Sequence, residues 1–456
     1  MKFCAAALII ISMSLFVASA SNRAIDPGPR GGPAGAGGLI PGISFALVTE
    51  AQDGLDRFQE LETFPGGLGP FYNSGPFGAC SECHAHPAIG GGSPAVNPQV
   101  SQDFNADGAT NAIPPFLSID GPVREMRLKF SRSVNGKLDA SSPDGSVHDL
   151  FSVTGRADNP TCTLAQPNFE RELADGNAIF RIPISLFGDG LIENIDDATI
   201  LANASSDSGA KRRYGVHGHP NYSSVSGVAN RSGNDATITR FGWKAQNKSL
   251  LMFSGEAYNV EVGVTNELFE TERPEPGSEL PPSCKTNATP EDQSNPGFVG
   301  VQVNSDITAF AAFMRLLDQP QPGPSTLSSV NGGKLFVSVG CSLCHTPSMT
   351  TGASNIDPML SSVAANLYSD LLLHDMGDGL ADGISQGNAG PREFRTAPLW
   401  GVGQRLFFLH DGRASDLLQA IEDHSSSGSE ANEVIREFNN LSQMQMQAIL
   451  NFLRSL

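Results

Sequence analysis

Two short cysteine motifs constrain this chain more than any other feature. Cys341-Ser-Leu-Cys344-His345 has the form C-x-x-C-H, and Cys80-Ser-Glu-Cys83-His84 repeats it upstream. In c-type haem attachment, two thiols at this spacing reach the two vinyl groups of one porphyrin, and the adjacent histidine binds the iron. Composition alone gives ~0.002 chance matches to this pattern. The motifs therefore predict two covalent haems, held by Cys80, Cys83, Cys341 and Cys344, with His84 and His345 as iron ligands.

Cysteine pairs at this spacing have two other common uses, a zinc site and a redox-active pair. A zinc site would need both C-x-x-C pairs to converge on one ion. A thioredoxin-like redox pair would need only one of them. Neither alternative requires a histidine directly after each pair, so both are less favoured than haem attachment.

The N-terminus predicts the compartment. A lysine at position 2 precedes an apolar run, and Ala18-Ser-Ala20 offers a small-residue cleavage site, so residues 1–20 resemble a secretory signal peptide. The apolar run is short for a bilayer span, and no later stretch reaches membrane length. Because c-type haem is attached outside the cytoplasm, we expect a periplasmic protein without a membrane span.

Charge and the remaining cysteines narrow the partners and the covalent structure. The formal net charge is −19, which argues against nucleic-acid binding. An acidic surface would suit a basic electron-transfer partner, although acidity more often serves solubility alone. Outside the motifs and the signal peptide only Cys162 and Cys284 remain. An even pair in an oxidising compartment favours a disulfide over two separate thiols.

The pattern of apolar residues predicts a mainly α fold with two cytochrome-c-like haem domains. Residues 21–45 are rich in Gly and Pro and are expected to form a flexible leader. The N-terminal haem domain is expected over 46–320, with a β-rich insertion at about 115–200. The C-terminal cytochrome c domain is expected over 325–456. Helices are predicted over 46–61, 303–317, 331–339 and 442–456, and strands over 123–130 and 178–184. Asp103 to Gly108 resembles the start of a calcium loop, but Pro114 stands at its twelfth position, so an Asx turn is favoured.

The C-terminal half resembles a known superfamily. Phe408-Leu-His410-Asp-Gly412 is similar to a His-Asp-Gly or His-Ser-Gly step in bacterial di-haem cytochrome c peroxidases and methylamine-utilisation proteins. In those proteins the sixth iron ligand, commonly Met, lies fourteen residues after that histidine. Here that position is His424. The resemblance implies His424 as sixth ligand of the Cys341 haem, and a bis-His haem would have a lower potential. The alternative is a surface histidine at a helix end.

A closer resemblance is to the di-haem oxidoreductases, also called thiol oxidoreductases. The segments that carry it are Phe187-Gly-Asp-Gly-Leu-Ile-Glu193, Arg240-Phe-Gly-Trp-Lys-Ala245, Leu373-His-Asp-Met-Gly377, Leu380-Ala-Asp-Gly383 and Glu393-Phe-Arg-Thr-Ala-Pro-Leu-Trp-Gly401. With the two cysteine motifs they cover most of the chain from about residue 70. The family's chemistry is known mainly by its relation to the peroxidases.

The resemblance to the peroxidases implies three catalytic residues near the Cys80 haem. Glu261, which follows Arg240 and Trp243 at a similar distance to the peroxidase glutamate, is the candidate acid–base for peroxide cleavage. Trp243 is the candidate relay between the haems, with core packing as the alternative. Arg240 is the candidate partner of a distal oxyanion or a propionate, and Glu256 is the reserve acid. An exposed carboxylate remains the alternative for Glu261.

Several further ligands are implied with less support. His219, with His217 beside it, could cap the Cys80 haem as a sixth ligand, though a metal-free loop histidine is the more favoured interpretation. His374 is another candidate ligand, whereas His86 lies too close to its motif. Arg395 and Arg413 are candidate propionate partners, or else form structural salt bridges. A calcium ion between the domains stays open, because carbonyl ligands leave no mark in a sequence.

The expected function is a periplasmic di-haem oxidoreductase. It would reduce hydrogen peroxide with electrons from a small donor protein, a cytochrome or a cupredoxin. One alternative is an oxidase or oxygenase acting on an organic or protein substrate. The other is a non-catalytic electron carrier with both irons six-coordinate.

Overall fold

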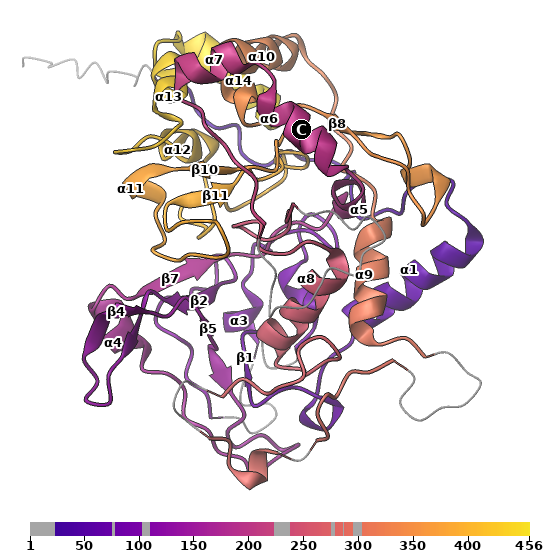
Figure 1. The fold of residues 1–456 in the computed structure, drawn as a ribbon, viewed down its shortest axis with the longest axis vertical. Coiled ribbons are helices and arrows are strands. Elements are labelled where there is room, and N and C mark those ends of the chain that lie inside the picture. Colours follow the sequence, from indigo (N-terminus) through magenta and orange to yellow (C-terminus); the bar gives the residue numbers. More distant parts are fainter. Residues whose placement is uncertain are drawn as a thin grey trace, which may run out of the picture.

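The computed structural model describes residues 23–74, 78–102, 110–222, 238–274, 279–285, 287–294 and 303–456. Across these residues helices outnumber strands, and the strands form small antiparallel sheets (Figure 1). The signal-peptide prediction and the Asp103 loop lie outside the described residues. Within the described part of the chain, we find no helix with the length and apolar content needed to cross a bilayer.

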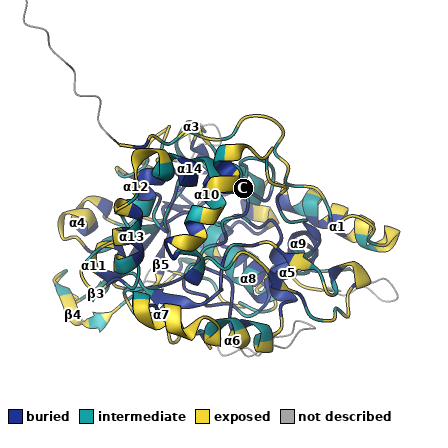
Figure 2. Ribbon diagram, turned by 90° about the horizontal axis from the view of Figure 1, so that it is seen from above, coloured by how far each residue is buried: buried dark blue, intermediate teal, exposed yellow. Residues whose placement is uncertain are grey.

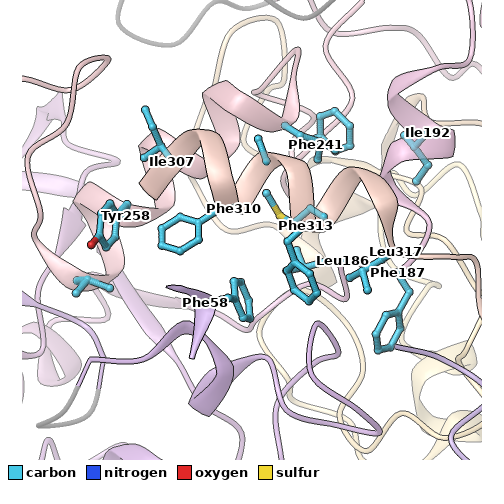
Figure 3. Close-up of a cluster of buried hydrophobic side chains, with 14 of the residues drawn as sticks. Phe58, Leu186, Phe187, Ile192, Phe241, Tyr258, Ile307, Phe310, Phe313 and Leu317 are labelled. Carbon is cyan, nitrogen blue, oxygen red and sulfur yellow. The ribbon is translucent and has the colours of Figure 1, made fainter. Parts of the chain in front are cut away.

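The N-terminal half is built around helices α1 (Phe45–Phe58), α8 (Leu250–Ala257) and α9 (Asp306–Leu316). Helix α1 begins where the Ser44 side chain accepts a hydrogen bond from the Leu47 backbone N–H. It crosses α9 closely at Gly54, because a Cβ at that position would collide with the carbonyl oxygen of Ala309. Phe58, Phe310 and Phe313 pack where the two helices meet (Figure 3). The helices predicted over 46–61 and 303–317 are thus confirmed.

The predicted β-rich insertion contains strands at both predicted positions. Strand β2 (Glu125–Leu128) lies between β5 (Val147–His148) and β7 (Ala178–Arg181) in an antiparallel sheet, with Met126 opposite both His148 and Phe180. The other strands of this region are β1 (Phe71–Tyr72), which pairs with β6 (Phe151–Ser152), and β3 (Phe130–Arg132), which pairs with β4 (Leu138–Pro143).

The C-terminal half repeats the crossing of two helices. Helix α10 (Leu327–Ser338) packs on α14 (Gln443–Leu453), and a Cβ at Gly332 would collide with the carbonyl oxygen of Ala448. Both helices begin with a capping box, at Thr326 and at Ser442. These are the helices that the sequence predicts over 331–339 and 442–456.

The remaining elements connect these pairs. The helices are α2 (Cys80–Cys83), α3 (Pro98–Ser101), α4 (Phe169–Ala174), α5 (Asp189–Glu193), α6 (Asp197–Ser205), α7 (Ser208–Tyr214), α11 (Gly377–Leu380), α12 (Leu417–Glu422) and α13 (Asn432–Asn439), with a π-turn η3 at Tyr258–Val262 and a 3-10 turn η5 at Cys341–Leu343. The strands are β8 (Met349–Thr350) paired with β9 (Ala364–Ala365), and β10 (Leu373–Asp375) paired with β11 (Glu393–Arg395).

The buried apolar residues divide unequally between the halves. One cluster contains the α1–α9 crossing and extends into residues 349–372 and Trp400. The other is built on α10, α12 and α14 and includes Ala24. The larger core therefore crosses the expected domain boundary near residue 320, so residues 349–372 pack with the N-terminal half.

The leader expected to be flexible is anchored over its described part. Asp26 forms a buried ion pair with Arg454, at 2.6 Å, and also accepts from the Leu417 backbone N–H, at 2.8 Å. The Arg30 N–H donates to the Gly403 carbonyl, at 2.7 Å. A Gly- and Pro-rich segment is thus held by side-chain and backbone contacts rather than by regular structure, and its composition does not reveal this.

The predicted disulfide is confirmed. Cys162 and Cys284 are bonded to each other, and both are buried in the larger core. The bond ties the β-containing insertion to the loop before α9.

Candidate haem cavities

Each cysteine motif opens onto its own cavity. Cys80, Cys83 and His84 line the first cavity, which has an empty volume of about 1170 Å³. The equivalent residues of the second motif line the second cavity, of about 1410 Å³. Each of these volumes includes space at the cavity mouth that is open to solvent. Their walls are mainly apolar, as a macrocycle with hydrophobic faces requires.

The same local turn presents both motifs. The His84 backbone N–H donates to the Cys80 carbonyl at 3.0 Å, and the His345 N–H donates to the Cys341 carbonyl at 3.0 Å. Each chain segment therefore folds back by one turn between its first cysteine and its histidine. This turn brings two thiols and an imidazole to the wall of one cavity.

Three imidazoles are held in the orientation that an iron ligand needs. Their Nδ1 atoms lie 3.0 Å, 3.0 Å and 2.7 Å from backbone carbonyl oxygens, for His84, His345 and His424 respectively. A carbonyl can only accept, so Nδ1 carries the proton and Nε2 keeps its lone pair. Burial lowers the pKa of His84 and His345 to about 4 and also lowers that of His424, so the rings are neutral at pH 7.

The four motif thiols fit attachment better than redox exchange. None of them is in a disulfide. Burial raises the pKa of Cys80 and of Cys341 to about 12, whereas the reactive cysteine of a redox C-x-x-C pair has a lowered pKa. The thioredoxin-like alternative therefore loses its support.

The zinc alternative, in which both cysteine pairs bind one ion, is also not supported by the described residues. The two cysteine pairs line different cavities and do not converge. Cys344, Asp370 and His374 do bring three ligand atoms within 4.8 Å of one another. Both ring nitrogens of His374 are already engaged, however, with Asp370 at 3.0 Å and Glu430 at 2.8 Å. Because these contacts engage both ring nitrogens, they also argue against His374 as an iron ligand.

The first cavity has carboxyl groups in its wall. Apart from His84, none of the described histidines lines it. Glu125, Glu256 and Glu261 line it instead, together with Arg127 and Arg181. Buried charges of this kind are costly without partners, so their collection around one space marks it as a site for polar chemistry.

Glu261 and Glu125 form a hydrogen-bonded pair in that wall. Burial, and then the charge of Glu125, raise the pKa of Glu261 well above its ordinary value. Burial alone would also raise the pKa of Glu125, but Arg127, at 2.7 Å, and Arg181 lower it below its ordinary value. The two shifts are opposite in direction, so a proton shared by the pair lies on Glu261, which donates it toward Glu125.

The backbone fixes the position of Glu261. It lies in the π-turn η3 that ends α8, a type of turn often found at functional sites. The Glu261 carbonyl accepts from the backbone N–H groups of Asn73 and Ser74, each at 2.9 Å. Gly263 follows with φ 78°, and its Cα packs against Gly69, where a side chain would not fit.

The second cavity has imidazoles where the first has carboxyl groups. His345 and His424 both line it, as do His374 and His410. Arg395 and Arg405 also line it, and burial lowers the pKa of each to about 10. A buried guanidinium favours an anionic partner, which makes both arginines candidates for binding a propionate. Arg395 lines the cavity and its Nε–H donates to the Gly242 carbonyl, so its role as a propionate partner stays a prediction.

Trp243 lies between the two cavities and lines both of them. Its indole N–H donates to the Ile182 carbonyl at 3.0 Å. The ring of His410 meets it edge-on, with centroids 6.4 Å apart, and is stacked on Phe394 at 4.3 Å. An aromatic path thus leads from the first cavity into the second.

Three predicted site residues lie elsewhere. The side chain of Arg240 is fully buried against the carbonyl of Ile192 and the carboxylate of Asp197 and lines neither cavity, so its assignment to a distal oxyanion or propionate is wrong. The guanidinium also donates to the Ile195 carbonyl just after α5, so its contacts are structural.

The predicted roles of Arg413 and His219 are also wrong, because each side chain is paired outside the first cavity. Arg413 pairs with Asp411 at 2.6 Å near the surface and lines neither cavity, so it is a salt bridge and not a propionate partner. His219 binds Glu393 at 2.8 Å, and its backbone pairs with Leu373 in the other half of the chain. That pairing holds it away from the first cavity, as it holds His217. His86 is occupied by the Gln404 carbonyl, at 2.9 Å.

Other site residues were missed by the sequence reasoning. Glu125, Arg127 and Arg181 belong to β2 and β7, whose alternating pattern predicts a polar face toward solvent. That face points into the first cavity instead, and all three side chains are shielded. The sequence held one hint of this: Glu125-Met-Arg127 places two opposite charges on the same face of a strand. Arg405 and His410 carried no signal beyond their residue types.

The sequence matches one known protein family over most of its length. The family model described as "Di-haem oxidoreductase, putative peroxidase" matches residues 127–456. This chain belongs to that family. The matched region of this di-haem oxidoreductase includes the second motif, Trp243 and Glu261, whereas the first motif precedes it. Membership establishes an oxidoreductase with haem cofactors.

Other comparisons add little. No curated protein matches this di-haem oxidoreductase. Hydrazine synthase of Kuenenia stuttgartiensis, solved under xenon pressure, has 21% identity and a TM-score of 0.23, over 35% of this chain and 59% of that one. A MauG-like protein associated with microbial copper homeostasis has 17% identity and a TM-score of 0.25, over 35% and 55%. The match spans less than two thirds of either structure, and TM-scores this low do not establish a shared fold.

Proposed function

We propose that this di-haem oxidoreductase is a periplasmic enzyme that reduces hydrogen peroxide with electrons from a small donor protein. Each half would be a cytochrome-c-like unit, and the first would carry the β-rich insertion. The proposal is supported by family membership, by the two motif-lined cavities, and by the different groups opposite the two motif histidines.

The residues that would hold the haems are the motif residues themselves. Cys80 and Cys83 would form thioethers in the first cavity, and Cys341 and Cys344 in the second. His84 and His345, whose Nδ1 atoms are held by backbone carbonyls, would bind the irons through Nε2, and His424 would be the second imidazole in the second cavity. The haems, when bound, supply the redox electrons and the iron position at which peroxide binds.

Glu261 and Glu125 would manage the protons of peroxide reduction. The reaction consumes two protons and two electrons and yields two waters, and a proton must move from the inner to the outer oxygen. A pair that holds one proton can both accept one and donate one. Arg127 and Arg181 keep Glu125 ionised, and burial keeps Glu261 protonated. Glu256 lines the same cavity and accepts a hydrogen bond from Asn247.

Trp243 would connect the two cavities. Its ring is fixed by the hydrogen bond to Ile182 and by contact with His410. An aromatic side chain in the walls of both cavities shortens the path that an electron must cross through saturated atoms. A donor protein would therefore need to reach only the second haem.

One observation carries the proposal. Among the described residues the first cavity has a single histidine and a hydrogen-bonded carboxyl pair, whereas the second has His345 and His424, each with Nδ1 held by a backbone carbonyl. A single imidazole leaves one iron face open to a small molecule, and two imidazoles close both faces. This asymmetry favours an enzyme over a carrier in which both irons are closed. The inter-domain calcium ion remains a proposal without a ligand set.

Absorption and electron paramagnetic resonance spectra of the purified protein, followed by peroxide titration of the reduced form, test the proposal. We expect two equivalents of covalent haem, one high-spin and one low-spin, and oxidation by one equivalent of peroxide per two electrons. Two low-spin haems in every redox state, without reaction with peroxide, would leave only the electron-carrier function. Oxidation of an organic or protein substrate at a rate above that of peroxide reduction would favour the oxidase alternative.

A further inference from the structure

One face of the C-terminal half reverses the charge of the molecule. Helix α7 carries Lys211, Arg212 and Arg213, and α10 beside it carries Lys334. Arg212, Arg213 and Lys334 are exposed, and none of the three forms an ion pair with a described carboxylate. In a chain of net charge −19 this is a local basic patch.

The same face exposes apolar side chains at helical spacing. Leu327, Val330 and Val337 of α10 are 94%, 51% and 55% exposed. They share one side of the helix, opposite Phe336 and Gly332, which face α14. Exposed apolar residues are usually scattered, whereas a stripe of them rimmed by charge marks an interaction site. Figure 1 shows both helices at the same end of the molecule, and Figure 2, seen from that end, shows α7 at the edge and α10 nearer the middle. We call this surface the α7–α10 face.

This face lies one layer of side chains away from the second cavity. Gly340 joins α10 to the Cys341 motif and has φ 100°, which favours glycine. A Cβ on Gly340 would lie 3.1 Å from the Tyr214 ring of α7 and 3.3 Å from Val434. Gly340 and Val434 both line the second cavity. A protein seated on α7 and α10 is therefore close to whatever the second cavity holds.

Charge near this face limits which partner fits. Glu433 and Glu437 of the neighbouring helix α13 are both paired with Arg436. One negative charge of α13 therefore remains, against the four cations of α7 and α10, so the face keeps a net positive charge next to the apolar stripe. Opposite charges at the rim of an interface accelerate encounter, and an apolar centre supplies contact area.

We infer that the α7–α10 face is the docking surface for a small electron-carrier protein that presents an apolar patch rimmed by Asp and Glu. This rests on the proposed function, since it names the donor's surface chemistry. It differs from the expectation that overall charge gives, which is a basic partner. The molecule would repel an acidic carrier over most of its surface and accept it here, so net charge would enforce the docking position.

Stopped-flow reduction of the holoprotein tests the inference with two probes, an acidic cupredoxin and a basic mitochondrial cytochrome c. At low ionic strength we expect the acidic probe to reduce the second haem faster, with a rate that falls as salt is added. The charge-reversal variant R212E/R213E should slow the acidic probe by about tenfold. Replacing the stripe by L327Q/V337Q should slow it at every salt concentration.

The matched control is R171E/K285E, which changes the net charge equally at exposed positions on α4 and on the loop after Cys284. It should leave the rate within about twofold. The inference is overturned if the control slows the acidic probe as much as R212E/R213E does, or if the wild-type protein prefers the basic probe at low salt.

Peroxide turnover driven by a small inorganic reductant separates the two proposals. Because such a reductant needs no docking surface, R212E/R213E and L327Q/V337Q should turn over peroxide like the wild type. Absence of peroxide turnover in all of them, with the acidic-probe dependence intact, would refute the proposed reaction and leave the docking surface standing. Normal turnover with no response to either variant would do the reverse.

Discussion

The two cavities have similar attachment segments and different facing walls. In each half a helix crosses a later one at a glycine, α1 over α9 at Gly54 and α10 over α14 at Gly332. In each a one-turn C-x-x-C-H segment presents thiols and an imidazole to a cavity. The walls that face the motif histidines differ. The first is made of strands β2 and β7 and the π-turn η3, which bring carboxylates and guanidinium groups. The second is made of the turn after α12, which brings His424.

The difference shows where the chemistry of such a protein is decided. The attachment turn is local and repeats with little change, whereas the facing wall is assembled from distant segments. One wall supplies a proton-sharing pair and the other a second imidazole. The same motif can therefore give one iron an open face and the other a closed one. The following experiments are designed to test that contrast.

The largest effect should follow removal of one attachment pair. The variant C80S/C83S should lose one of the two covalent haem equivalents and all peroxide turnover, because the carboxyl pair would face an empty cavity. The matched variant C341S/C344S should also lose one equivalent but keep peroxide binding at the first cavity. A pyridine haemochrome assay and peroxide titration measure both. Loss of peroxide binding in C341S/C344S, and its retention in C80S/C83S, would reverse the assignment of the cavities.

Removing the shared proton should affect only the first cavity. Glu261→Gln keeps the size of the side chain but cannot release a proton, so we expect peroxide turnover to fall by about 10²- to 10⁴-fold. Haem content and the spectrum of the second haem should be unchanged. Because the protonated acid is the working form, wild-type turnover should decline as pH rises through the raised pKa of Glu261. Glu256→Gln is the control and should cost less than tenfold; a larger loss there would exchange the two roles.

Replacing the second imidazole should affect only the second cavity. His424→Met restores the ligand common in the peroxidases and should raise the potential of that haem by on the order of 100 mV. His424→Ala should convert the same haem to high spin. Spectroelectrochemical titration resolves the two haems. If neither variant changed the potential or the spin state, the iron would not be bound by His424.

A change at Trp243, on the aromatic path between the cavities, should have a smaller effect than the changes above. Trp243→Phe keeps an aromatic ring but removes the indole N–H that Ile182 binds, and phenylalanine is harder to oxidise. Electron transfer from the second haem to the first should slow by about tenfold, or about 1.4 kcal/mol of barrier. Flash reduction of the second haem, followed at both haem wavelengths, measures it. Phe241→Leu is the control for packing and should leave the rate unchanged; equal slowing there would favour a packing role for Trp243.

The smallest effect concerns carboxyl groups behind the first cavity. Burial raises the pKa of Glu62 from 4.5 to about 7, although the hydroxyl of Tyr258 donates to it at 2.6 Å. Between these values the folded protein holds a proton that the unfolded chain has released. Stability should therefore fall as pH rises through this window, and no such loss is present below pH 4.5.

Glu62→Gln tests that loss because glutamine cannot ionise. At pH 8 the variant should be about 1–3 kcal/mol more stable than the wild type, and the gain should vanish near pH 4. Urea unfolding at both pH values measures the free energy. Glu50→Gln, at an exposed position on α1, is the control. A gain that is equal at both pH values would mean that Glu62 shares no proton equilibrium with folding.

The sequence predicted much of the framework because the signals are short in range. The helices α1, α9, α10 and α14 follow from apolar spacing and capping residues within a few positions. The pairing of Cys162 with Cys284 follows from parity once the motifs are set aside. Two failures are long in range: Arg240 and His219 are polar residues in plausible motifs whose distant partners, Asp197 and Glu393, take them out of the cavities. Arg413 pairs with Asp411 only two residues away, and its position outside the cavities is set by the fold.

By itself, the sequence determined that there are two C-x-x-C-H motifs with a histidine next to each, and it placed the chain in its family. Those properties lie within five consecutive residues or in residue-by-residue likeness, so no fold is needed to see them. Only the tertiary structure decided what faces each motif. Glu125 and Glu261 meet because a strand of the insertion and a helix end pack on one cavity, and burial then makes them share a proton. That environment is a property of the packed chain, since charge and burial act through space and not along the sequence.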